Sequence, residues 1–194
     1  MGQPSKYMQN DPTQFKDGLQ TLQAIAFDVD GTLTDGTLTW NASDPASESK
    51  SFHFADIMGI SLARRLGIKL ALISGEPSPL VDRFAEKLRI PHVVKGCRDK
   101  AAALTEWSAL TGVPLANTCF FGDDVNDLWA MEIVGLCACP ADAAEEVLAY
   151  VATHPGGFIS QQLGGAGAVR EFIDTLLKAR NLEGKHVFKL RPPE

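Results

Sequence analysis

A short apolar run followed by two aspartates constrains the fold of this chain more than any other feature. Residues 24–27 read Ala-Ile-Ala-Phe, which predicts a buried strand, and Gly31 predicts the turn that ends it. Asp28 and Asp30 follow directly where the strand ends. Ligands bind at the carboxyl ends of strands in open α/β sheets, so these two carboxylates are candidates for cation binding, nucleophilic attack and proton transfer.

Two other interpretations of this acidic turn are a calcium-binding loop and an ordinary surface turn. A calcium loop needs Gly at its sixth position and Glu at its twelfth, and this chain has Leu33 and Thr39 there. A surface turn rich in Asp and Gly is compatible with the stretch taken alone. The choice therefore depends on the rest of the chain.

Length and composition favour one soluble domain spanning residues 1–194. Hydrophobic residues make up 45% of the chain and charged residues 22%, as in ordinary globular proteins. The net charge of −6 argues against nucleic acid or an anionic membrane as partner, so local cations must meet any anionic substrate. Neither a membrane span nor a signal-peptide core is evident, and the cysteines lack Cys-x-x-Cys spacing, so we expect free thiols and a cytoplasmic protein.

The order of apolar and polar segments predicts a doubly wound parallel α/β sheet, because strands and helices alternate. We expect strands over residues 24–27, 69–73, 91–94, 118–121 and 135–138, with residues 151–152 as candidates for a closing strand. We expect helices over residues 12–22, 57–66, 79–88, 99–110, 141–150 and 168–179, and another that ends near Ile133. The glycine-rich residues 156–167 are expected to form loop or turn.

Three segments are expected to lie outside this alternating core. Residues 1–22 form a polar lead-in, and residues 181–194 form a tail. Residues 37–54 are expected to form a β-hairpin, with strands at 37–40 and 51–54 around a long polar tip. This insert is too short to form a domain of its own.

Further polar groups follow the other predicted strands and would meet Asp28 and Asp30 at one edge of the sheet. Ser74 and Gly75 offer a hydroxyl and a backbone N–H to phosphate oxygens, and Lys100 offers an ammonium. Asp123 and Asp127 could complete a cation site. Each has a structural alternative, as a turn residue, a solvated lysine or a helix-capping acid, but their common location favours one phosphoryl-transfer site.

These motifs resemble the haloacid dehalogenase superfamily of aspartate-nucleophile phosphatases, and they match it in order over most of the chain. The match is closer still to its small branch that acts on 2-keto-3-deoxy sugar acid phosphates. Larger relatives insert a cap domain between these motifs, whereas the segments between them are short here, so the resemblance implies no cap domain and an open site. The segments that carry the resemblance are Asp28-Val-Asp-Gly-Thr-Leu-Thr-Asp-Gly, residues 52–60, Gly96-Cys-Arg-Asp-Lys, Gly122-Asp-Asp-Val-Asn-Asp and Gly164-Gly-Ala-Gly-Ala-Val-Arg-Glu.

The resemblance implies a role for each candidate residue. Asp28 would be the nucleophile and Asp30 the general acid and base. Mg²⁺ would be held by the Asp28 carboxylate, the Asp30 main-chain oxygen and Asp123, with Asp127 supporting the metal shell. The substrate-binding residues would be Ser74, Gly75, Glu76, Lys87, Lys100, Asp56 and Arg170.

The resemblance also implies a small anionic sugar phosphate as substrate, and a homotetramer. The branch as a whole favours 3-deoxy-D-manno-octulosonate 8-phosphate, whereas Glu76 with Lys87 resembles the variant acting on 2-keto-3-deoxy-nonulosonate 9-phosphate. The hairpin would make the tetramer contacts, and a neighbour's carboxyl-terminal segment would cover the site. Val187 and Phe188 make the tail a candidate for that cover, with a frayed terminus as the alternative.

Two non-catalytic interpretations stay open at this point. Receiver domains of signalling proteins share a doubly wound sheet, an acidic Mg²⁺ cluster, an acceptor aspartate, a hydroxyl and a lysine. They usually lack an acid two residues past the acceptor, so Asp30 favours an enzyme. The intact Asp28, Asp30 and Asp123 argue against a relative that only binds its ligand.

Overall fold

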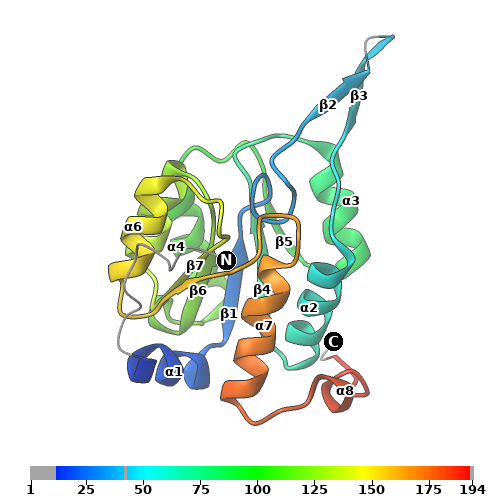
Figure 1. The fold of residues 1–194 in the computed structure, drawn as a ribbon. Coiled ribbons are helices and arrows are strands. Elements are labelled where there is room, and N and C mark those ends of the chain that lie inside the picture. Colours follow the sequence, from blue (N-terminus) through cyan, green and yellow to red (C-terminus); the bar gives the residue numbers. More distant parts are fainter. Residues whose placement is uncertain (1–11, 42, 193–194) are drawn as a thin grey trace, which may run out of the picture.

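Six parallel strands form the central sheet of the computed structural model, which describes residues 12–41 and 43–192 (Figure 1). The strand order across the sheet is β5-β4-β1-β6-β7-β8. Their bounds are β1 Ala24–Phe27, β4 Lys69–Ile73, β5 His92–Val94, β6 Thr118–Phe121, β7 Leu136–Cys139 and β8 Gly157–Ile159. The chain thus builds outward from β1 in one direction and then in the other, which confirms the doubly wound α/β fold.

The register of β1 brings the functional loops together at one edge of the sheet. Phe27, the last residue of β1, is level with Leu72 of β4 and with Phe121 of β6. All four residues of β1 are fully buried, as expected for a central parallel strand covered on both faces. The loops that follow these three strands therefore begin within one residue of the same level.

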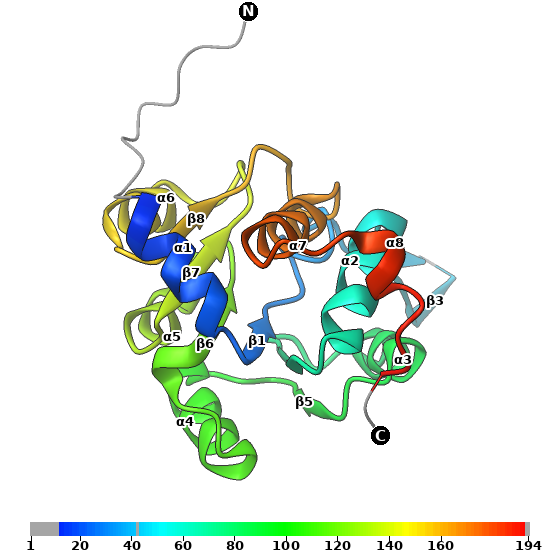
Figure 2. The same cartoon turned by 90° about the horizontal axis from the view of Figure 1, so that it is seen from below.

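Helices cover both faces of the sheet and create two hydrophobic clusters. Side chains from α1, α2, α3, α7 and α8 pack on one face, and those from α4, α5 and α6 on the other. Figure 2 shows α1, α7 and α2 on one side of the sheet and α4 on the opposite side. The helix bounds are α1 Pro12–Thr21, α2 Phe54–Arg65, α3 Pro79–Leu88, α4 Lys100–Thr111, α5 Leu128–Glu132, α6 Glu145–Thr153, α7 Ala168–Ala179 and α8 Gly184–Val187.

Capping residues fix the two helices that begin beside the site. The Ser78 hydroxyl accepts a hydrogen bond from the Leu80 N–H, and Pro79 occupies the first position of α3. The Asp99 carboxylate accepts from the Ala102 N–H, so α4 begins at Lys100. These caps place the first residue of each helix at the edge where the strands end.

The hairpin is present, but its second strand lies elsewhere than the sequence predicts. The observed strands are β2 Thr39–Asn41 and β3 Asp44–Ser49, which pair antiparallel and project from the body (Figure 1). The expected strand at residues 51–54 is wrong, because Phe54 already begins α2 and the His53 ring accepts from the Ala55 N–H. Most of the described side chains of this hairpin are exposed, so polar residues can form it through backbone pairing.

The last strand of the sheet also differs from the expectation. Residues 151–152 do not close the sheet; they belong to α6, where Val151 packs into the core one turn after Val147. The closing strand is β8, within the glycine-rich segment that was expected to be loop. Three residues on an edge give too short a pattern for burial periodicity to reveal.

The described part of the tail, residues 181–192, packs on the body of the same chain. Val187 in α8 is buried in the larger cluster, and the Arg65 guanidinium at the end of α2 donates to the Leu190 carbonyl and lies over the Phe188 ring.

All four cysteines are free thiols, as predicted, and Cys119, Cys137 and Cys139 are buried. Among the described residues, no helix combines the length and the apolar character needed to cross a membrane.

Candidate active site

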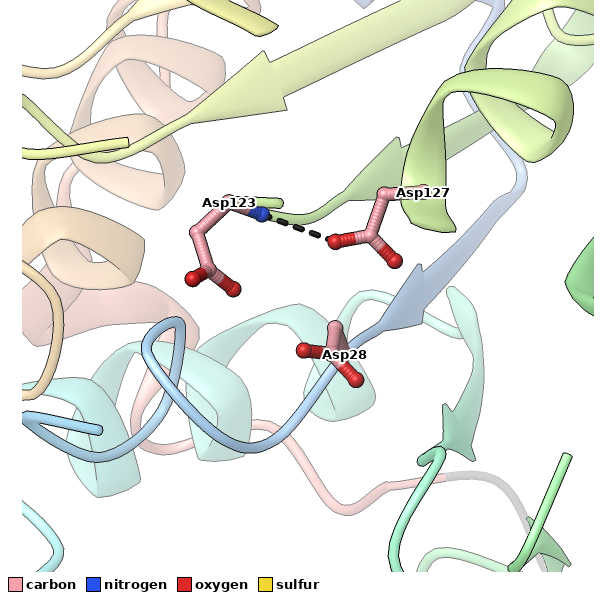
Figure 3. A group of neighbouring side chains, drawn as sticks. All are labelled: Asp28, Asp123 and Asp127. Carbon is pink, nitrogen blue, oxygen red and sulfur yellow. Dashed lines mark hydrogen bonds between the residues drawn. The ribbon is translucent and has the colours of Figure 1, made fainter. Parts of the chain in front are cut away.

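Three carboxylates and one ammonium meet where β1 and β6 end. Asp28 follows β1, and Asp123 and Asp127 follow β6 (Figure 3). An oxygen from each carboxylate lies within 4.8 Å of the others. Lys100, buried at the start of α4, donates to Asp28 Oδ1 at 2.8 Å and to Asp127 Oδ1 at 2.6 Å. The structure therefore assembles four residues that the sequence predicted as one site.

Asp127 is held on both oxygens by protein groups. Its Oδ1 accepts from Lys100, and its Oδ2 accepts from the N–H groups of Asp123 and Asp124 at 2.9 and 3.2 Å. It is fully buried, and Figure 3 shows its bond to the Asp123 backbone. Asp127 therefore fits the supporting position that the resemblance implies, orienting Lys100 and the loop that carries Asp123.

The loop after β1 closes over Asp123 at a glycine. Gly31 has a positive φ of 89°, and a Cβ there would lie 2.1 Å from Asp123 Oδ2. Both the backbone conformation and the space thus require glycine. Beside it, the Thr32 hydroxyl donates to Asp123 Oδ1 at 3.0 Å. Thr32 orients this carboxylate, a role that was not predicted because threonine has many structural uses in turns.

Burial and neighbouring negative charges raise the pKa values of two carboxylates at this site. Burial, reinforced by Asp127, raises the pKa of Asp28 to about 6 despite the opposing effect of Lys100. Burial, together with Asp28 and Asp127, raises the pKa of Asp123 to about 8. Burial works to lower the pKa of Lys100, but its two carboxylate partners outweigh it, and that pKa is raised.

This donor set fits a magnesium ion. Three carboxylates against one ammonium leave an excess of two negative charges, which a divalent cation would neutralise. Oxygen donors are the ligands that Mg²⁺ prefers, and it is usually bound through one or two carboxylates. Asp28 and Asp123 each receive one side-chain donor on one oxygen, from Lys100 and Thr32, so each can offer the other oxygen to a cation.

The raised pKa values predict that Mg²⁺ binding depends on pH. Protons and Mg²⁺ compete for Asp28 and Asp123, so the dissociation constant should rise as pH falls from about 8 to about 6, by up to about tenfold per unit for each proton displaced. Titration calorimetry of the metal-free protein would measure this. An affinity independent of pH over that range would contradict the assignment of these two carboxylates.

The stability of the metal-free protein should fall as pH rises, whereas its affinity for Mg²⁺ should increase. Folding raises both pKa values above 3.8, so the folded state binds more protons than the unfolded chain between about pH 4 and 8. The contribution of these groups to stability is therefore lost as pH rises through that interval. Mg²⁺ should restore more stability at about pH 8 than at about pH 6.

Asp30 lies beside this cluster and is held by a residue that was not predicted. Lys50, just after β3, has its ammonium 2.5 Å from Asp30 Oδ1. On the other side, the Ser74 hydroxyl lies 3.5 Å from Asp30 Oδ2. Lys50 is the sole Lys or Arg in residues 37–54, a signal in the sequence that could have singled it out.

The predicted phosphate-binding turn follows β4 as expected. Ser74 is fully buried, and its hydroxyl accepts from the Glu76 N–H at 3.1 Å, which fixes the turn. Gly75 is exposed at the same edge. Glu76 and Lys87 are both exposed, and the Lys87 ammonium lies 5.9 Å from the centre of the Phe54 ring. The structure thus places Ser74 at Asp30 and Lys87 at the far end of α3.

Asp56 and Arg170 join α2 to the start of α7. The buried Asp56 carboxylate accepts from the N–H groups of Gly167 and Arg170, at 3.0 and 2.8 Å. The Arg170 guanidinium pairs with Asp174, one turn further along α7. Asp56 therefore has a structural role that spacing alone did not reveal, because its partners lie more than a hundred residues away in sequence.

Comparisons with known proteins agree with this geometry. Residues 92–154 match the family of haloacid dehalogenase-like hydrolases. The 3-deoxy-D-manno-octulosonate 8-phosphate phosphatase of Haemophilus influenzae is 35% identical over 162 residues, which cover 84% of this chain and 86% of that protein. The phosphatase of the same name from Escherichia coli K12 is 31% identical over 166 residues, covering 83% of this chain and 82% of that protein.

A solved structure matches the fold as well as the sequence. The crystal structure of 3-deoxy-D-manno-octulosonate 8-phosphate phosphatase from Moraxella catarrhalis, in complex with magnesium ion, phosphate ion and KDO, is 32% identical with a TM-score of 0.81. The match covers 88% of this chain and 94% of that chain. With Asp28, Asp123, Asp127 and Lys100 gathered at one sheet edge, this chain belongs to the haloacid dehalogenase superfamily of phosphatases and is a phosphoric monoester hydrolase.

Proposed function

We propose that the protein is a Mg²⁺-dependent phosphatase of 2-keto-3-deoxy sugar acid phosphates, with 3-deoxy-D-manno-octulosonate 8-phosphate as its substrate. The observation that carries this proposal is Asp28, buried at the end of β1 between Lys100 and Asp123. The names of the relatives from Haemophilus influenzae and Escherichia coli support the choice of substrate. Residues 1–194 would act as one catalytic domain without a cap, in the cytoplasm.

In the first step, Asp28 would attack the phosphorus atom. The Asp28 oxygen forms a bond to phosphorus while the bond from phosphorus to the sugar oxygen breaks. The sugar oxygen keeps the electron pair of the broken bond and takes a proton from Asp30. Lys100, the Ser74 hydroxyl and the Gly75 N–H would hold the phosphoryl oxygens. Mg²⁺, held by Asp28, the Asp30 main-chain oxygen and Asp123, would supply positive charge that stabilises the transferred phosphoryl group.

In the second step, water would release the phosphoryl group from Asp28. Asp30, now a carboxylate, takes a proton from water as the water oxygen bonds to phosphorus. The bond from phosphorus to Asp28 breaks, and its electron pair restores the carboxylate. Asp30 thus acts as acid and then as base.

Glu76 supports a second candidate substrate, 2-keto-3-deoxy-nonulosonate 9-phosphate. Its side chain is exposed two residues past Ser74, and its own N–H bonds to the Ser74 hydroxyl. From there the carboxylate could accept hydrogen bonds from sugar hydroxyls beyond the phosphate. It would also repel a substrate carboxylate that came near.

Comparing catalytic efficiency on the two sugar acid phosphates tests the proposed function. We expect the octulosonate ester to be preferred by about tenfold or more, which corresponds to about 1.4 kcal/mol in the transition state. A clear preference for the nonulosonate ester would instead favour 2-keto-3-deoxy-nonulosonate 9-phosphate as the substrate, as Glu76 suggests. If Mg²⁺ supports turnover of neither ester, the proposal is wrong.

We also propose that the hairpin assembles the protein as a homotetramer. Trp40 on β2 is 67% exposed, and Phe54, just past the hairpin, is 77% exposed. Large exposed apolar groups on a two-stranded hairpin favour burial against a partner. Sedimentation equilibrium at micromolar protein should give four times the mass of one chain, and Trp40→Ser should lower the mass. A stable monomer would refute the assembly.

A further inference from the structure

The buried side chain of Lys50 reaches the proposed general acid from the end of the hairpin. The Lys50 side chain is only 2% exposed, and its ammonium is 2.5 Å from Asp30 Oδ1. Lysine is among the side chains least often buried, because an ammonium must recover in the protein the interactions that it loses in water. Asp30, whose side chain is 29% exposed, supplies an acceptor oxygen, Oδ1, for that ammonium whether or not its other oxygen carries a proton.

The hairpin holds Lys50 in place independently of Asp30. Two residues before it, the Glu48 carboxylate accepts a hydrogen bond from the Ser78 hydroxyl at the start of α3. Two residues after it, the Phe52 ring stacks on Phe84 of α3, with ring centres 4.0 Å apart. Lys50 therefore lies between two contacts to the same helix, which fix the backbone from which it reaches Asp30.

The two oxygens of Asp30 have different neighbours. An ammonium carries donors only, so Oδ1 must act as an acceptor toward Lys50. When Asp30 is protonated, its proton is therefore favoured on Oδ2. The Ser74 hydroxyl, in the phosphate-binding turn, donates to that oxygen at 3.5 Å, but it can donate instead to the Glu76 carbonyl at 3.3 Å, which leaves Oδ2 free to carry the proton.

We propose that Lys50 is a positioning residue, which holds Asp30 so that the oxygen carrying the proton faces the leaving group. This inference rests on the proposed function. As phosphorus bonds to Asp28, the phosphorus–oxygen bond of the ester breaks, and the proton on Asp30 Oδ2 passes to the departing oxygen. Lys50 keeps its own protons and acts through Asp30. An ester whose leaving group needs no proton should therefore be insensitive to Lys50.

The test uses first-turnover rates of leaving-group release with Mg²⁺, because these isolate phosphoryl transfer to Asp28 from the later hydrolysis. For 3-deoxy-D-manno-octulosonate 8-phosphate, we expect Lys50→Met to lower the saturating rate by about tenfold to a hundredfold, a part of what a general acid contributes. The half-saturating concentration should stay the same. For p-nitrophenyl phosphate, whose leaving group is stable as an anion, the rate should change by less than about threefold.

Three further variants separate positioning from other roles. Lys50→Arg should recover part of the lost rate, since arginine can also donate to Oδ1. In an Asp30→Asn background, adding Lys50→Met should cost nothing more, because the positioned acid is already absent. Lys95→Met serves as the control, since Lys95 also pairs with an aspartate, Asp82 of α3, which is not among the candidate site residues.

Several results would overturn the inference. Equal losses on both esters, a raised half-saturating concentration or an added loss in the Asp30→Asn background would assign Lys50 to substrate binding or to folding. An unchanged rate of Lys50→Met with the sugar ester would show that Lys50 has no role in this step. These outcomes differ from failure of the proposed function, in which the unmodified protein itself turns over neither ester.

Discussion

Asp28→Asn is expected to abolish phosphatase activity, lowering kcat by roughly four orders of magnitude or more. The amide that replaces the carboxylate is a poor nucleophile and a poor ligand for Mg²⁺. Its shape is preserved, and its oxygen can still accept the hydrogen bond that Lys100 donates to Asp28 Oδ1. Steady-state rates with the proposed sugar phosphate and with p-nitrophenyl phosphate would measure the loss.

The same variant should fold at least as well as the original chain. Folding raises the pKa of Asp28 to about 6, so the ionised carboxylate destabilises the metal-free fold above that pH, and the neutral amide removes this cost. We expect no decrease in melting temperature for the metal-free variant at about pH 8. Asp35→Asn, an exposed position in the same loop, is the matched control and should keep full activity. Near-normal rates for Asp28→Asn would show that Asp28 is not the nucleophile.

Gly164→Ala is expected to be the most damaging substitution outside the carboxylate cluster. A Cβ at this position would lie 1.8 Å from the Gly31 carbonyl oxygen, in the loop that carries Asp30. The two backbones also join through the hydrogen bond from the Gly165 N–H to the Thr32 carbonyl. The clashing atom belongs to the backbone, which cannot rotate out of the way as a side chain could. The loop that carries Asp30 must therefore shift.

Such a shift should reduce both stability and rate. Overpacking of a buried contact typically costs about 1–3 kcal/mol, and displacing a catalytic group by about 1 Å can cost on the order of a hundredfold in rate. Gly184→Ala is the matched control, because its Cβ would meet only ordinary contacts at 3.7 Å. Chemical denaturation and kcat should show no change there. A fully active Gly164→Ala protein would contradict the support that we assign to this glycine loop.

The sheet and the positions of the carboxylates could be predicted because they depend on local pattern. Buried parallel strands such as residues 24–27 and 118–121 are continuous apolar runs, and helices such as residues 79–88 carry clear caps. Once the strands are placed, parallel pairing forces Asp28 and Asp123 to the same edge. The resemblance then identified the chemistry that this edge performs.

The remaining features could not be predicted because they depend on tertiary contacts. Most of the described side chains of the hairpin strand β3 are exposed, and the edge strand β8 has only three residues, all half-buried, so no periodicity marks either strand. The contact of Lys50 with Asp30 depends on how the hairpin docks on α3. The hydrogen bonds that Asp56 accepts from the backbone at the start of α7 likewise join residues far apart in sequence, and the substrate-binding role that the resemblance implies for Asp56 stays a prediction.

Trapping the phosphorylated protein is the most direct test of the account. Protein mixed with Mg²⁺ and phosphorus-labelled sugar phosphate, then quenched in acid within the first turnover, should carry label that hydroxylamine removes, as expected for an acyl phosphate. Peptide mapping should place the label on Asp28, and Asp28→Asn should carry none. Turnover of the ester with no label on the protein, or with label on a residue other than Asp28, would contradict the mechanism.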